Sequence, residues 1–105
     1  MCDRTPLYFE LCEGRHKIPE AVDGAIFKHA IDPSNIDGMM VACDLLLSTC
    51  RNKVHLHVYV TGLSVALVSV INYCQQWGIP LTLHHWNPTI QDYYTQEVLI
   101  YPRAS

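Results

Sequence analysis

The segment from Val54 to Trp86 constrains the fold more than any other part of the chain. It begins V-H-L-H-V-Y-V, an alternation of apolar residues with polar or aromatic ones that is typical of a strand. A mostly apolar stretch follows and stops at Gly78 and Pro80, residues that commonly end a helix. Leu81 to Trp86 is a second extended run. The segment therefore predicts a right-handed strand–helix–strand unit over residues 54–86, with its two strands parallel.

The rest of the chain predicts three more strands and one more helix. Apolar residues recur at steps of three and four between residues 33 and 51, which predicts an amphipathic helix with Asp32 as N-cap and Pro33 at its first position. Further strands are expected at 7–12, 24–30 and 93–101, the last in a C-terminal hairpin with the strand before it. The order β-β-α-β-α-β-β indicates a small Rossmann-like α/β sandwich, one α/β domain over residues 1–105.

Composition excludes several classes of protein. Half of the 105 residues are hydrophobic and only 16% are charged, unlike a disordered chain. The net charge of -3 argues against strong direct nucleic-acid binding through phosphate neutralisation. No apolar run suits a membrane span or a signal peptide. Five cysteines without a C-x-x-C pair indicate reduced core thiols, and we expect a soluble cytoplasmic protein.

Ligands of an open parallel sheet bind beyond the carboxyl ends of its strands. At one such end, Thr61, Gly62 and Ser64 offer hydroxyls and backbone N–H groups at the start of a helix. This T-G-x-S sequence fits either an ordinary capped helix or an anion site, and it lacks the glycine density of a phosphate loop. The other binding candidates flank the final turn: His84, Trp86 and Tyr93.

Histidines are the main candidates for chemistry. His84 and His85 must point to opposite faces of their strand, and His84 can meet His55 or His57 of the neighbouring strand. Such a cluster fits a metal site or a general base, but neither strand has a carboxylate to orient the rings, so a structural role is favoured. With no complete catalytic set and no zinc knuckle, we expect no catalytic residue, no metal and no other cofactor.

The helix expected at residues 64–77 is apolar almost all round. That pattern is explained either by three-layer packing, which buries both sides, or by a partner or a second copy in a homodimer. The candidate interface residues are carboxylates of the first helix and large side chains of the second: Asp37, Asp44, Val65, Tyr73 and Trp77.

Three stretches together resemble a group of known proteins: E-G-R-H-K-I-P-E-A-V-D-G-A-I-F at 13–27, Y-V-T-G-L-S-V-A-L-V-S-V-I-N-Y-C at 59–74, and T-L-H-H-W-N-P…D-Y-Y-T-Q-E-V at 82–98. They resemble small proteins of phages and other mobile genetic elements of gut bacteria, some of which are anti-CRISPR inhibitors of RNA-guided type II nucleases. The resemblance implies a non-enzymatic interaction protein that inhibits a CRISPR effector nuclease by occupying its surface. This is our leading expectation.

Residues 59–86 are also similar to the ligand-sensing CARF domains of CRISPR accessory proteins. That resemblance implies a module that binds a cyclic oligonucleotide at a dimer interface, or a ring nuclease that cleaves it. Thr61, Gly62 and Ser64 would then contact phosphates, and His84 or Tyr93 would line the pocket. No basic residue stands beside T-G-L-S, which departs from what an anionic ligand requires.

Overall fold

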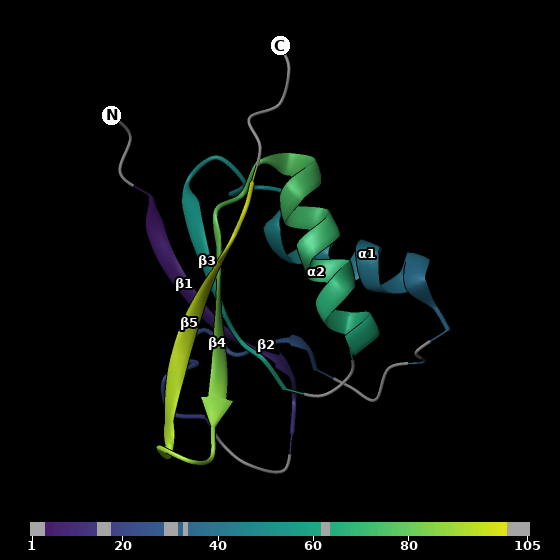
Figure 1. Ribbon diagram of the computed structural model, residues 1–105. Helices are drawn as coiled ribbons and strands as arrows, with labels where there is room; N and C mark the ends of the chain where they lie inside the picture. Colours follow the sequence, from purple (N-terminus) through teal and green to yellow (C-terminus); the bar gives the residue numbers. More distant parts are fainter. Residues whose placement is uncertain (1–3, 15–17, 29–31, 33, 62–63, 101–105) are drawn as a thin grey trace.

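The computed structural model describes residues 4–14, 18–28, 32, 34–61 and 64–100, and its described elements follow the predicted order (Figure 1). In chain order they are β1 (Thr5–Cys12), β2 (Ala25–Phe27), α1 (Ile36–Leu47), β3 (Val54–Tyr59), α2 (Ser64–Trp77), β4 (Leu81–Asn87) and β5 (Asp92–Val98). The predicted order β-β-α-β-α-β-β is thereby confirmed.

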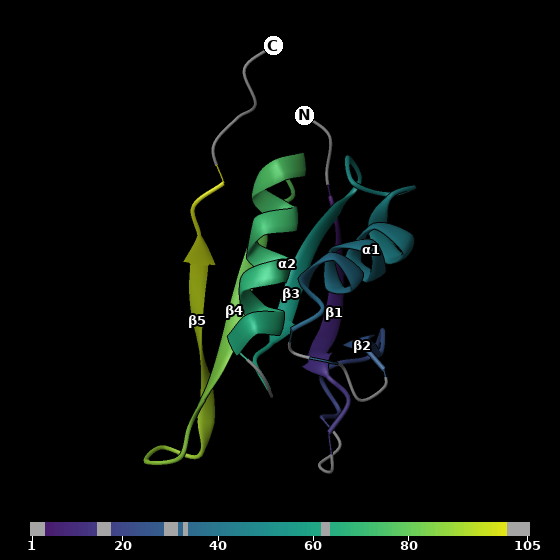
Figure 2. The ribbon, with the colours of Figure 1, turned by 90° about the vertical axis from the view of Figure 1, so that its right-hand side faces the viewer.

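The strands form one mixed sheet in the order β2-β1-β3-β4-β5. The first four are parallel to one another, and β5 is antiparallel to β4, completing the C-terminal hairpin. Both helices lie against the same side of the sheet, and the β3–α2–β4 crossover is right-handed (Figure 2). The fold is a two-layer α/β sandwich of Rossmann-like character, so three-layer packing does not explain the apolar sequence of α2.

The helix-facing side of the sheet forms one wall of the core. The alternation in β3 directs Val54, Leu56 and Val58 toward the helices, where each is at most 4% exposed. The helices contribute Cys43 and Cys74, which are buried and free, as expected of core thiols. Burial raises the pKa of both thiols to about 12, so they stay protonated at neutral pH.

Helix α1 starts later than its sequence predicts. The Asn35 side chain accepts a hydrogen bond from the backbone N–H of Gly38 at 3.0 Å and caps the helix. Asp32 instead accepts bonds from the N–H and hydroxyl of Ser34 in the preceding turn, so its prediction as N-cap was wrong. Pro33, the expected first helical residue, lies outside the described residues.

The bounds of other elements also differ from the prediction. β1 begins earlier, at Thr5, β4 reaches Asn87, and β2 covers residues 25–27 of the predicted 24–30. α1 ends at Leu47 rather than at residue 51, because successive turns over residues 48–53 carry the chain into β3. β5 ends at Val98, before the predicted limit of residue 101.

The apolar residues of α2 are largely covered within the chain itself. Several apolar side chains of α2 are partly buried against the core: Val65, Leu67, Ile71 and Trp77. Among the large apolar side chains of this helix, only that of Val68 is more than half exposed. Covering comes from the sheet and from α1, which packs along α2. No helix in the described part of the chain is both long and apolar enough to cross a bilayer.

Candidate functional site: the open face of the sheet

No helix of the described residues packs on the side of the sheet away from α1 and α2, and we refer to this side as the open face (Figure 1). Residues paired directly across neighbouring strands lie on the same face, and the register pairs Tyr8 with His57, Tyr59 with His84, and Trp86 with Tyr93. Seven rings from four strands share this face, and we refer to them as the ring network: Tyr8, His55, His57, Tyr59, His84, Trp86 and Tyr93.

The first part of the ring network spans β1, β3 and β4. The His57 ring stacks on both Tyr8 and His55, with ring centroids 4.5 Å apart in each pair. It also tilts against His84 at 5.2 Å. His57 is therefore the point where rings from three strands meet.

The second part of the ring network reaches the edge of the sheet. The Tyr59 ring stacks on His84 at 4.4 Å and meets Tyr93 edge-on at 4.9 Å. Tyr93 in turn lies edge-on to Trp86 at 5.1 Å. Tyr59 is only 6% exposed, whereas Trp86 is 50% exposed, so the network passes from a buried centre to an accessible end.

Hydrogen bonds fix the histidines in place. The Thr82 hydroxyl donates its single hydrogen to Glu97 Oε1 at 3.0 Å, and it also lies 2.8 Å from His55 Nε2. Because that hydrogen is already used, His55 must donate from Nε2, which sets its tautomer. His57 Nδ1 and His84 Nε2 are 3.0 Å apart, so one of these two nitrogens carries a hydrogen and the other accepts it.

Burial favours neutral histidines at the centre of the face. It lowers the pKa of His57, and the neighbouring His55 and His84 lower it further, while Glu97 opposes them. Burial also lowers the pKa of His84, again against the effect of Glu97. Both rings are consequently neutral at pH 7 and can share one hydrogen, as their hydrogen bond requires.

The charge on this face is negative. None of the five strands contains a Lys or Arg, whereas Glu10 and Glu97 lie on the open face beside the rings. The pKa values of Tyr59 and Tyr93 are raised mainly by burial, and the charge of Glu20 raises both further, which places that carboxylate near the same rings. Aromatic rings flanked by carboxylates suit a cation, above all a guanidinium, better than a phosphate.

The same residues do not make a metal centre. Within the described ranges, no group of three or more His, Cys, Asp or Glu is arranged to hold a metal ion. The histidines are instead bonded to one another and to Thr82.

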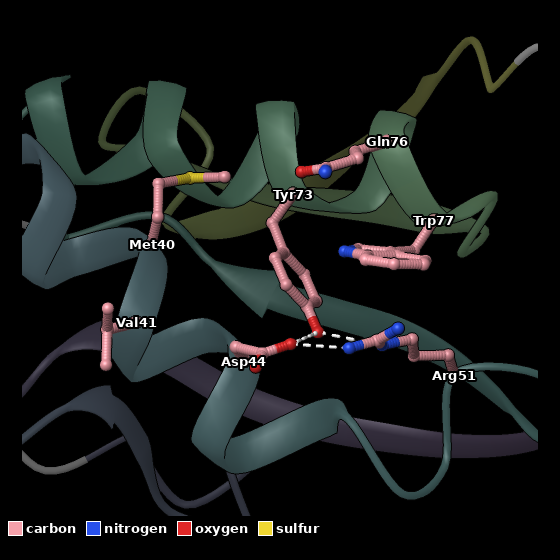
Figure 3. A pocket seen from close by; sticks show the side chains of 7 residues that line it. All are labelled: Met40, Val41, Asp44, Arg51, Tyr73, Gln76 and Trp77. Carbon is pink, nitrogen blue, oxygen red and sulfur yellow. Dashed lines mark hydrogen bonds and ion pairs between the residues drawn. The ribbon is translucent and has the colours of Figure 1, made fainter.

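A second feature is a pocket of about 300 Å³ between α1 and α2 (Figure 3). Asp44 Oδ1 accepts hydrogen bonds from Arg51 at 2.5 Å and from the Tyr73 hydroxyl at 2.8 Å, which together lower the Asp44 pKa. Arg51 also donates to the Tyr73 hydroxyl at 3.0 Å, and its guanidinium lies 3.5 Å from the centre of the Trp77 ring. These bonds tie α1, α2 and the turn after α1 together.

The binding residues predicted from the sequence lie in three different places. His84, Trp86 and Tyr93 belong to the ring network on the open face. The Thr61 hydroxyl bonds to the backbone O and N–H of Cys12, joining the ends of β1 and β3. Ser64 lines a groove of the helical layer with Ile36 and Val68, among others. Gly62 lies outside the described residues.

The predicted interface residues all lie on the helical layer. Asp44, Tyr73 and Trp77 line the pocket between the helices, and Tyr73 is buried there. Val65 lines the groove beside Ser64, and Asp37 is exposed in the first turn of α1.

Several residues of the site were missed by sequence reasoning. Tyr8, Thr82 and Glu97 lie in predicted strands, but their partners depend on register. Arg51 falls at the end of the helix predicted over residues 33–51, whereas in the structure it lies after the helix and pairs with Asp44. Its position relative to Trp77 depends on the packing of two helices far apart in sequence.

Comparison with known proteins gives no relative from which to infer a role. The chain matches no family model, no curated protein and no solved structure.

Proposed function

We propose that this chain is a non-enzymatic interaction protein, an inhibitor that binds an RNA-guided type II nuclease through the open face of its sheet. The observation that carries the proposal is the ring network, which lies between carboxylates on a sheet whose strands contain no Lys or Arg. At protein interfaces, a few aromatic side chains commonly supply most of the binding energy. A face that carries several such rings and no helix of the described residues is therefore suited to binding a partner.

The chemistry of this face matches an arginine-bearing protein surface. Trp86 and Tyr93 supply ring faces on which a planar guanidinium stacks, and Glu97 supplies a carboxylate on the same face. RNA-guided nucleases hold their nucleic acids in a positively charged channel, which provides such a partner. Opposite charge across the interface speeds association and excludes unsuitable partners.

Charge also favours a protein over a nucleotide ligand. The same rings are suited to stacking on bases, but a phosphate chain crossing the face would meet Glu10, Glu20 and Glu97. The Thr61 hydroxyl, a candidate phosphate contact, is bonded to the backbone of Cys12. Binding of a cyclic oligoadenylate would instead raise the melting temperature of the protein, and no shift at high ligand concentration dismisses that alternative.

The proposal is tested with a purified type II nuclease, its guide RNA and target DNA. Excess protein is expected to suppress cleavage and to co-elute with the nuclease on a sizing column. Undiminished cleavage together with separate elution would refute the nuclease as target.

A matched pair of variants tests the face itself. Trp86 is 50% exposed on the open face, and Tyr94 is 51% exposed on the opposite side of the same hairpin. Trp86→Ala should weaken inhibition by about tenfold or more, the effect of removing an aromatic anchor, while Tyr94→Ala should leave it nearly unchanged. Equal losses in both variants, or no loss in Trp86→Ala, would show that the partner binds elsewhere.

A further inference from the structure

The two edge strands of the sheet differ in how accessible they are for pairing with a strand of another chain. β2 forms one edge with only three residues, all of them buried. β5 forms the other edge with seven residues, most of them exposed, and it pairs with β4 in a continuous register from Asp92 to Val98. No other described strand pairs with its outer side.

β5 lacks most of the usual features that keep an edge strand from pairing. Natural edges are commonly short, interrupted by a bulge, or carry proline or charged residues, lysine above all. The charged residues of β5 are Asp92 and Glu97. The sequence D-Y-Y-T-Q-E-V has no Lys, Pro or Gly, its pairing with β4 shows no bulge, and Tyr93, Tyr94, Thr95 and Val98 all favour strand structure. A long, regular edge of this kind is a template for another strand.

We propose that two copies of this chain pair through β5, antiparallel about a two-fold axis at Thr95, so that their sheets become one continuous sheet. This register sets Thr95 opposite Thr95, Tyr93 opposite Glu97, and Asp92 opposite Val98 of the second copy. No carboxylate stands opposite another. Asp92 and Glu97 also point to different faces of the sheet, because five positions separate them.

Pairing of two β5 strands would also bury exposed apolar side chains that lie in or near this strand, which adds hydrophobic stabilisation to the backbone hydrogen bonds. Of the nine large hydrophobic residues exposed in the described parts of the chain, four lie at the hairpin or just after it. They are Trp86, Ile90, Tyr94 and Leu99. Tyr94 and Leu99, 51% and 71% exposed, lie in or directly after the strand that would form the seam.

Pairing through β5 leaves the open face free. The two ring networks would lie on the same side of the joined sheet, with Tyr93 and Glu97 of each copy meeting at the seam. The inference does not rest on the proposed nuclease partner, since it concerns the backbone edge of β5. Tyr93 and Glu97 nevertheless lie both at the seam and on the open face.

The test is sedimentation equilibrium of the full chain over a range of concentrations, with Thr95→Lys as the disrupting variant. The wild-type mass should rise from 12.0 kDa toward twice that value. Thr95→Lys sets two like charges opposite each other and should raise the dimer dissociation constant by about tenfold or more. Thr89→Lys, the same change at an exposed position of the hairpin turn, is the control and should dimerise normally.

Hydrogen exchange identifies the surface that pairs. Amides of β5 should become more protected as concentration rises, while those of β2 should not change. A monomeric mass at every concentration would overturn the inference. A dimer that Thr95→Lys does not weaken, with protection gained on α2, would show that the copies pair through their helices instead. Circular dichroism confirms that both lysine variants remain folded.

Discussion

The two faces of the sheet are built from the same strands but differ in burial and in the contacts that hold their side chains. In β3, Leu56 and Val58 face the helices and are fully buried, while His57 between them faces away and is only partly buried. The helix-facing side is apolar and close-packed, whereas the open side holds its rings by stacking and hydrogen bonds. The two-residue period of a strand therefore separates the side chains of the core from those of the face proposed for binding, and neighbouring substitutions can test this separation.

The largest expected effect comes from adjacent substitutions in β3. Leu56→Ala removes a side chain that is 0% exposed and should lower the free energy of unfolding by about 2–5 kcal/mol. His57→Ala, one residue along, removes a partly buried ring and should cost clearly less. Urea unfolding of both variants measures the difference. Equal losses would show that the open face is as much a part of the core as the helical side.

A smaller effect is expected in the helical layer. Tyr73→Phe keeps the buried ring but removes the hydroxyl that donates to Asp44 and accepts from Arg51. Because Asp44 and Arg51 remain paired, the free energy of unfolding should fall by only about 1 kcal/mol.

Tyr94→Phe is the matched control for this change, since Tyr94 is half exposed and lies outside the helical layer. It should leave the unfolding midpoint nearly unchanged. If Tyr73→Phe lowered the free energy of unfolding by much more than one hydrogen bond contributes, the cluster of Asp44, Arg51 and Tyr73 would act as a cooperative network.

Much of the fold was predictable because its signals are local. The alternation from Val54 to Val60 identifies a strand, and Gly78 with Pro80 marks the end of α2 without any knowledge of the rest of the molecule. The start of α1 was not predictable in the same way, because Asp32 and Asn35 are both good caps and only the surrounding chain decides between them.

The candidate site was only partly predictable because its contacts join distant segments. Alternation places His55, His57 and Tyr59 on one face, and a meeting of His57 with His84 was among the expectations. The sequence of β3 does not indicate that β1 is its second neighbour in the sheet. The stacking of Tyr8 on His57 therefore could not be predicted from the residues around either ring. The same holds for Glu97, whose bond to Thr82 requires the register of the hairpin.

The smallest expected effect is a change of folding stability with pH that is caused by His57 and His84 of the open face. The pKa values of His57 and His84 are lowered in the folded protein, chiefly by burial, from an ordinary value of 6.5. A lowered folded pKa means that the unfolded chain binds more protons at mildly acidic pH. The resulting stability is therefore fully present above pH 6.5 and is lost as the pH falls through that value toward the folded pKa values.

Unfolding in urea between pH 7.5 and 5.5 measures this loss, which should be small because both rings are partly solvated. The double variant His57→Gln, His84→Gln should flatten the dependence, while His85→Gln, on the helix-facing side of β4, should not. The raised pKa of Glu10, caused mainly by burial, acts in the opposite direction, because the cost of burying its charge is relieved as the pH falls through that pKa toward 4.5. A stability that stays level down to pH 5.5 would mean that the shared hydrogen between His57 and His84 does not hold the open face together.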